Sequence, residues 1–103
     1  MPVRGRESMS QFHLVFRVHA IQRMFQRKVS KEEVRRVIET GETIATYPTD
    51  KPFPSRLILG WIGSRPIHVV AADNATVKET IIVTVYQPDA GEWDGEFKRR
   101  ISR

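Results

Sequence analysis

The first third of the chain changes from a strand-like to a helix-like hydrophobic pattern. Between Phe12 and Val18 apolar and polar residues alternate, which favours a short strand, with a backward extension of the following helix as the alternative. From residue 19 to residue 27 the apolar residues recur at helical spacing instead. They share one arc, which we expect to pack on the core: Ala20, Ile21, Met24 and Phe25. The opposite arc, which we expect to face solvent, carries His19, Gln22, Arg23, Gln26 and Arg27.

A second helix is predicted between Ser30 and Gly41. Ser30 and Glu33 have the spacing of a capping box, in which a hydroxyl and a carboxylate each bond an otherwise unpaired backbone amide. Val29 and Val34 occupy the two positions of a hydrophobic staple. Gly41 stands where a left-handed residue commonly ends a helix. We expect the buried stripe of this helix to consist of Val34, Val37 and Ile38.

The rest of the chain has the pattern of strands separated by turns. Apolar, β-branched runs over residues 43–47, 56–62, 65–73 and 80–86 predict strands. The proline-rich stretch 48–54 predicts a loop. Gly63 and Ser64 suit a two-residue type II′ turn, so the second and third runs should form a hairpin. A tail with Trp93, Phe97 and a basic end follows Pro88.

This turn assigns the two faces of the predicted sheet, because it pairs Leu59 with His68 and side chains alternate along a strand. One face is entirely apolar and carries Ile58, Ile62, Ile67, Val69 and Ala71. The other face joins His68 to Leu57, Leu59, Trp61 and Val70. In the last strand, we expect the apolar face to include Ile81, Val83 and Val85, since a one-residue slip would bury polar side chains. Thr84 and Tyr86 then share the face of His68.

These elements predict an α+β fold in a single domain over residues 11–103, after a flexible N-terminus over residues 1–10. Two N-terminal helices cover the apolar face of a three- to four-stranded antiparallel meander. The His68 face is left as the candidate working surface, partly covered by the aromatic tail. His19 and Arg23 can join His68 only if they lie at the rim of their helix, near a sheet edge.

Composition narrows the classes of protein that fit. The 103 residues include no cysteine, which excludes a disulfide framework and a thiolate site. No apolar run is long enough to span a bilayer, and the N-terminus lacks a signal-peptide apolar region, so we expect a cytoplasmic protein without a membrane partner. A formal net charge of +5 favours polyanionic or acidic partners. No paired-histidine spacing or glycine-rich phosphate loop occurs, so we predict no metal site and no cofactor.

Three groups of residues together form a recognisable pattern. The first comprises His19, Ala20, Arg23, Met24, Arg27, Val29 and Ser30. The second comprises Tyr47, Pro48, Asp50, Pro52, Pro54, Ser55, Arg56 and Gly60. The third comprises Pro66, His68, Val69, Thr84, Tyr86, Pro88, Trp93 and Phe97. From about Val18 to Arg100 the chain resembles the bacterial family called domain of unknown function 4258, and the combination is more specific than any of its parts.

The resemblance implies a function, because that family looks like a relative of the RelE/ParE-type and BrnT-type toxins. It implies a small RelE-like toxin architecture and a metal-independent endoribonuclease that acts on mRNA within a type II toxin–antitoxin pair. It also implies a small antitoxin partner, because members of the family often sit beside a small antitoxin-like protein with a zinc-finger segment.

Two histidines are the candidates for proton transfer. RNA cleavage without metal needs a base for the 2′-hydroxyl and an acid for the leaving oxygen. His19 begins a helix, where the helix dipole disfavours the protonated form and so suits a base. The alternative is that His19 caps the helix or pairs with a loop carboxylate. His68 lies mid-strand among apolar residues, where a core histidine without catalytic work is the alternative.

Arginines and one tyrosine are the candidates for phosphate binding and assistance. Arg23 and Arg27 lie one turn apart and can grip one phosphate or two adjacent ones, unless they form ion pairs with Glu32 or Glu33. Arg56 follows a rigid loop and either points into the site or pairs with Asp50 or Glu42. Tyr86 can donate a hydrogen bond or stack on a base. The tail adds further phosphate-binding candidates: Lys98, Arg99 and Arg100.

The same residues fit two other functions. A non-catalytic basic module would dock an acidic protein partner or nucleic acid with the same surface. Alternatively, the apolar meander edge mediates homodimerisation and the basic surface is incidental. We expect Trp93 and Phe97 to anchor the tail on the sheet rather than to stack on bases.

Overall fold

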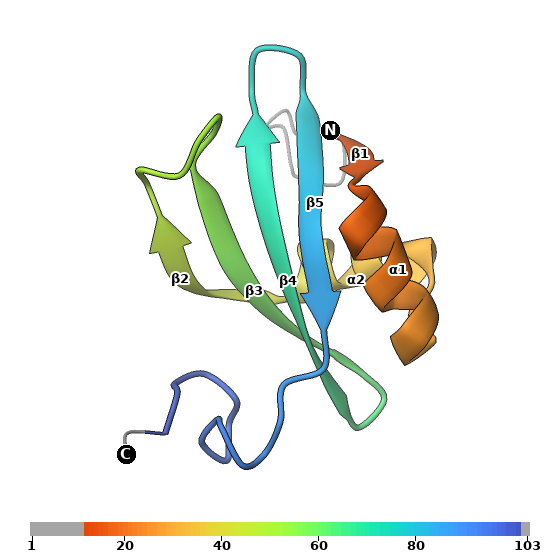
Figure 1. Cartoon of the computed structure of the whole chain (residues 1–103), viewed down its shortest axis with the longest axis vertical. Coiled ribbons are helices and arrows are strands. Elements are labelled where there is room, and N and C mark those ends of the chain that lie inside the picture. Colours follow the sequence, from red (N-terminus) through yellow and green to blue (C-terminus); the bar gives the residue numbers. More distant parts are fainter. Residues whose placement is uncertain (1–11, 102–103) are drawn as a thin grey trace, which may run out of the picture.

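A computed structural model describes residues 12–101, so the flexible N-terminus predicted for residues 1–10 lies outside the described part. Within it, five strands and two helices form one α+β unit (Figure 1). A strand precedes the two helices, and four strands follow them. The elements are β1 (His13–Phe16), α1 (Val18–Arg27), α2 (Lys31–Thr40), β2 (Glu42–Tyr47), β3 (Ser55–Ile62), β4 (Arg65–Asn74) and β5 (Glu79–Tyr86).

The sheet differs from the predicted antiparallel meander of three to four strands. Its order is β1-β5-β4-β3-β2, and β1 pairs with β5 in parallel, with Leu14 opposite Thr80. Strands β2 to β5 form the expected antiparallel meander. The parallel pair was missed because β1 joins the last strand across both helices and most of the sheet, and local pattern does not encode such a contact.

The predicted hairpin between β3 and β4 is confirmed. Gly63 has a φ of 62°, and the register pairs Ile62 with Arg65 and Leu59 with His68. The all-apolar face packs against the helices as expected. Its members in the buried core cluster are Ile58, Ile67, Val69 and Ala71, with Ile62 packed against it.

The predicted assignment of β5 side chains to the two faces of the sheet is correct for the end of the strand and wrong for its start. Val85 pairs with Val69 and is fully buried, and Thr84 and Tyr86 share the face of His68 as predicted. The register shifts between Val70 and Ala71, where Val83 is an extra residue on β5. A bulge of this kind reverses the alternation beyond it, so Ile82 enters the core instead of Ile81.

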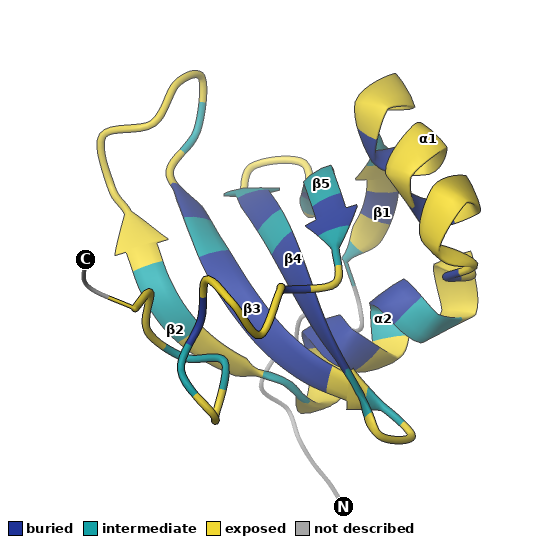
Figure 2. Ribbon diagram, turned by 60° about the horizontal axis from the view of Figure 1, so that its bottom comes forward, coloured by how far each residue is buried: buried dark blue, intermediate teal, exposed yellow. Residues whose placement is uncertain are grey.

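Helix α1 buries a narrower stripe than its sequence predicts. Only Ala20 and Met24 are buried, while Ile21 is 44% exposed and Phe25 is 86% exposed. The helix lies beside β5 at the edge of the sheet rather than across its middle, so most of its circumference faces solvent (Figures 1 and 2). The expected packing of the whole apolar arc is therefore wrong.

Helix α2 begins as predicted and ends differently. The Ser30 hydroxyl accepts from the Glu33 amide at 3.0 Å, and the Glu33 carboxylate accepts from the Ser30 amide at 2.9 Å. Gly41 is extended, with φ −79°, and is not the left-handed residue that we expected. A side chain there would lie 2.5 Å from the Val37 carbonyl oxygen, so close approach of backbone is what requires glycine.

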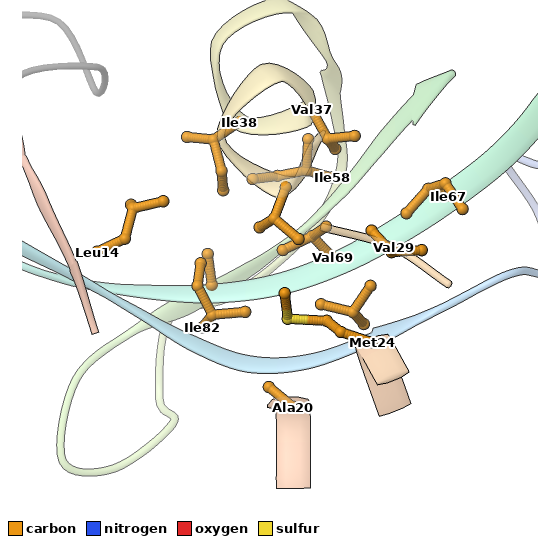
Figure 3. Close-up of a cluster of buried hydrophobic side chains, with 13 residues drawn as sticks. Leu14, Ala20, Met24, Val29, Val37, Ile38, Ile58, Ile67, Val69 and Ile82 are labelled. Carbon is orange, nitrogen blue, oxygen red and sulfur yellow. The ribbon is translucent and has the colours of Figure 1, made fainter. Parts of the chain in front are cut away.

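The core fills the space between the two helices and one face of the sheet. Figure 3 shows Met24 of α1, Val37 of α2 and Val69 of β4 turned toward a common interior. Val37 sits directly over Gly60 of β3, where an added Cβ would lie 2.8 Å from its methyl carbons. Neither helix in the part of the chain that the structure describes is long and apolar enough to cross a membrane.

The contact between Val37 and Gly60 gives a test of this packing. We expect Gly60→Ala to destabilise the fold by about 1–3 kcal/mol, because the methyl group overpacks the α2–β3 contact. Urea denaturation measures the change. Gly95→Ala is the matched control, since its Cβ meets nothing within 4 Å. Adding Val37→Ala to the Gly60 variant should recover part of the loss, and simple additivity of the two changes would contradict this account.

Candidate functional site

The tail after β5 crosses the sheet face opposite the helices (Figure 2). Trp93 is buried and meets the His68 ring edge-on, with ring centroids 4.5 Å apart. Phe97 meets Trp61 in the same manner at 5.9 Å. Both aromatic residues therefore anchor the tail, as the sequence indicates.

A pocket of about 380 Å³ opens where α1, the end of β5 and the tail meet. Its polar lining consists mainly of arginines, one tyrosine and two carboxylates: Arg23, Arg27, Tyr86, Asp89, Glu92 and Arg100. The pocket joins two surfaces that the sequence left separate, the basic arc of α1 and the face of His68. They meet because β1 pairs only with residues 79–82 of β5, and α1 lies beside the strand at this edge.

The arginines of this pocket carry charge that is poorly neutralised. Within residues 12–101 the side chains of Arg23 and Arg27 form no ion pair, so the predicted alternative of bridges to Glu32 or Glu33 is wrong. Arg100 lies 5.2 Å from the Trp93 ring and 3.8 Å from Glu92. Because the guanidinium groups of Arg23 and Arg27 have no ion-pair partner within the described residues, their N–H donors are left for a bound anion.

His68 lies behind Tyr86 and is fully buried. Its Nε2 is 2.8 Å from the Phe97 carbonyl oxygen, which only accepts, so Nε2 carries the proton and donates it. Its Nδ1 is then an acceptor, and the Tyr86 hydroxyl donates a hydrogen bond to it over a distance of 3.1 Å. Burial, opposed by the Phe97 hydrogen bond and reinforced by the Arg100 charge, lowers the pKa of His68, which is therefore neutral at pH 7.

Tyr86 lines the pocket and offers its hydroxyl oxygen as a hydrogen-bond acceptor. Its proton points inward to His68, so toward a ligand the phenol oxygen acts as an acceptor. Burial raises the pKa of Tyr86 above its ordinary value of 10.0, and the hydroxyl stays protonated at neutral pH. The pocket therefore combines guanidinium donors for an anion with one acceptor for a neighbouring hydroxyl.

The model of the family described as "Domain of unknown function (DUF4258)" matches residues 16–87, more than half of the chain. This chain belongs to the DUF4258 family. No curated protein and no solved structure matches it. The family match contains Arg23, Arg27, His68 and Tyr86 and stops just before the tail that supplies the opposite wall of the pocket.

Two predicted site residues of this DUF4258 domain lie elsewhere. His19 is exposed and is not part of the pocket lining. Arg56 lies on the helix-side face of the sheet, where its Nε is 3.0 Å from Asp73. The carboxylate of Asp73 also accepts from the Thr80 hydroxyl at 2.8 Å. The structure thus gives Arg56 an ion pair, although with Asp73 and not with Asp50 or Glu42.

Of the three basic tail residues predicted to bind phosphate, only one lines the pocket. Arg100 lines the pocket, whereas Lys98 forms an ion pair with Glu42 at 3.1 Å, and hydrogen bonding to that carboxylate raises the pKa of Lys98. Arg99 is exposed and does not line the pocket. The structure therefore brings together Arg23, Arg27, Tyr86 and Arg100, with His68 behind them.

Arg65 is a residue that sequence reasoning missed. One nitrogen of its guanidinium donates to the Arg27 carbonyl oxygen at 2.6 Å and another to Gln87 at 3.4 Å. It thereby ties the C-terminal end of α1 to the end of β5. Its position just after the hairpin turn could have drawn attention, but its partners lie far away in the sequence.

The neutral state of His68 predicts how stability depends on pH. Its pKa is lower in the folded than in the unfolded chain, so below about 6.5 the unfolded chain binds more protons and stability falls. We expect the free energy of unfolding to drop between pH 7 and pH 5.5, and His68→Gln to flatten this dependence. Exposed His19→Gln is the control and should retain it. An unchanged slope in the His68 variant, measured by urea denaturation, would contradict the assignment.

Proposed function

We propose that this DUF4258 domain is an mRNA-cleaving toxin of a type II toxin–antitoxin pair that binds a phosphodiester in the Arg23–Arg27–Arg100 pocket. One observation carries the proposal: three arginines line the same pocket as Tyr86, and two of them lack ion pairs within the described residues. Guanidinium forks match phosphate geometry and stabilise the charge that builds on phosphorus during cleavage.

The pocket supplies groups for cleavage without metal. The Tyr86 oxygen accepts a hydrogen bond from the hydroxyl of the adjacent nucleotide and so positions the scissile phosphodiester. Glu92 takes the 2′-proton as the 2′-oxygen attacks, the bond to the 5′-oxygen breaks, and that oxygen takes a proton from solvent. The products are a 2′,3′-cyclic phosphate and a 5′-hydroxyl. His68 acts through Tyr86 as a positioning residue.

The toxin assignment rests on the family resemblance and on charge. Two helices on an antiparallel meander fit the RelE-like architecture that the resemblance implies. The net charge of +5 suits both RNA and a small acidic antitoxin, which in such pairs carries a zinc-finger segment.

A non-catalytic module that docks nucleic acid or an acidic protein is the second candidate. The placement of the two histidines favours it. Both ring nitrogens of His68 are occupied and its side chain is buried, while His19 lies outside the pocket. No histidine therefore touches a ligand held by the arginines.

Cleavage and binding measured separately decide between these functions. Wild type should degrade single-stranded RNA in excess EDTA, and Arg23→Ala with Arg27→Ala should weaken binding at least about tenfold, because two charge-assisted hydrogen bonds are lost. Tyr86→Phe should slow cleavage about tenfold or more while binding falls less. Arg17→Ala with Arg36→Ala removes the same charge from exposed sites outside the pocket and is the matched control.

Each outcome of this experiment has a distinct meaning. RNA that binds without being cleaved supports the docking module over the ribonuclease. RNA that does not bind at all contradicts the pocket as a nucleic-acid site. Expression of the ribonuclease should also slow bacterial growth, and co-expression of its antitoxin should restore it.

A further inference from the structure

A second hollow adjoins the phosphate pocket on the other side of the segment that leaves β5. It measures about 440 Å³ and shares Arg27, Gln87, Pro88 and Asp89 with the first pocket. Its remaining wall includes Pro66 and Phe97. Because four residues line both hollows, a phosphate held in one lies next to whatever occupies the other.

Part of the wall of this second hollow is formed by Pro66, Pro88 and Phe97, which are firmly held. Pro66 and Pro88 are buried prolines, and Phe97 has a left-handed backbone with φ 60°. That conformation is unfavourable for a bulky side chain and is fixed here by two hydrogen bonds, from the Phe97 amide to Asp94 at 2.9 Å and from His68 to the Phe97 carbonyl. Such flat, rigid walls suit a planar aromatic ring.

Two polar side chains face the same hollow with complementary chemistry. The Asp89 carboxylate accepts from the Gly91 amide at 3.1 Å and forms no ion pair within residues 12–101, so most of its acceptor capacity is left. The Gln87 side-chain oxygen faces Arg65, which leaves its NH₂ group to donate elsewhere. The hollow thus offers an acceptor pair and a donor beside an apolar wall.

We propose that the second hollow binds the nucleobase next to the held phosphate and that Asp89 selects guanine. Guanine offers two adjacent N–H donors, at N1 and N2, that match a carboxylate, and its O6 accepts from Gln87. Adenine and cytosine place a ring-nitrogen acceptor where guanine has N1–H, and that lone pair repels a carboxylate. Uracil has one N–H between two carbonyl acceptors. This inference rests on the proposed function and adds the base that the site prefers.

Binding of short RNAs that differ at one base tests the proposal. Fluorescent seven-nucleotide uridine RNAs with G, A, C or U at the centre serve as probes at fixed salt, and 2′-fluoro groups in place of their 2′-hydroxyls prevent cleavage. Wild type should bind the G probe about tenfold or more tightly than the others, as expected for one paired carboxylate contact. Asp89→Asn should remove this preference, while its side-chain oxygen still accepts from the Gly91 amide and keeps the turn.

Two control variants distinguish loss of the base contact from a general change in charge and from loss of phosphate binding. Glu96→Gln removes one negative charge from an exposed tail position outside both hollows, and it should keep the preference for G. Arg23→Ala should weaken all four probes alike.

Two results overturn the guanine assignment: equal binding of the four probes by wild type, or an unchanged preference in Asp89→Asn. If wild type binds none of the probes, the proposed function itself fails.

Discussion

The hydrogen-bonded chain from the Phe97 carbonyl through His68 to Tyr86 is the constraint on which the candidate site depends. It links the tail, the centre of β4 and the end of β5 inside a buried space. An acceptor at one end decides which ring nitrogen of His68 is protonated, and this decides where the Tyr86 proton points. The polarity of the pocket therefore depends on a backbone carbonyl of a residue outside the pocket lining.

The placement of α1 is the second feature on which the candidate site depends, because it brings Arg23 and Arg27 to the pocket that Tyr86 lines. A helix packed across the middle of the sheet would carry Arg23 and Arg27 away from Tyr86. At the edge, its narrow stripe of Ala20 and Met24 is sufficient for anchoring, and the arginines reach around β5. The cost is exposed apolar surface at Ile21 and Phe25. Arg65 donates to the carbonyl oxygen of Arg27, the last residue of the helix, and so holds α1 at this edge.

The sequence predicted what depends on local rules and missed what depends on distant contacts. The capping box at Ser30, the hairpin at Gly63 and the shared face of His68 and Tyr86 follow from spacing and alternation, and all three are confirmed. The bulge at Val83, the parallel pairing of β1 and the extended Gly41 depend on tertiary packing. The candidate site could be predicted as a set of residue types, but His19 could not be separated from it without knowing where α1 lies beside β5. The alternation that puts Ile58 on the helix-side face already puts Arg56 there.

The parallel pairing of β1 with β5 also orders events during synthesis. The first strand of the described chain finds its partner only after residue 82 has been made, and α1 has no sheet edge to pack on until then. The tail that completes the pocket is made later still. Until residue 82 has been made, β1 and α1 therefore lack β5 as their tertiary partner, and the pocket is complete only once Arg100 has been made.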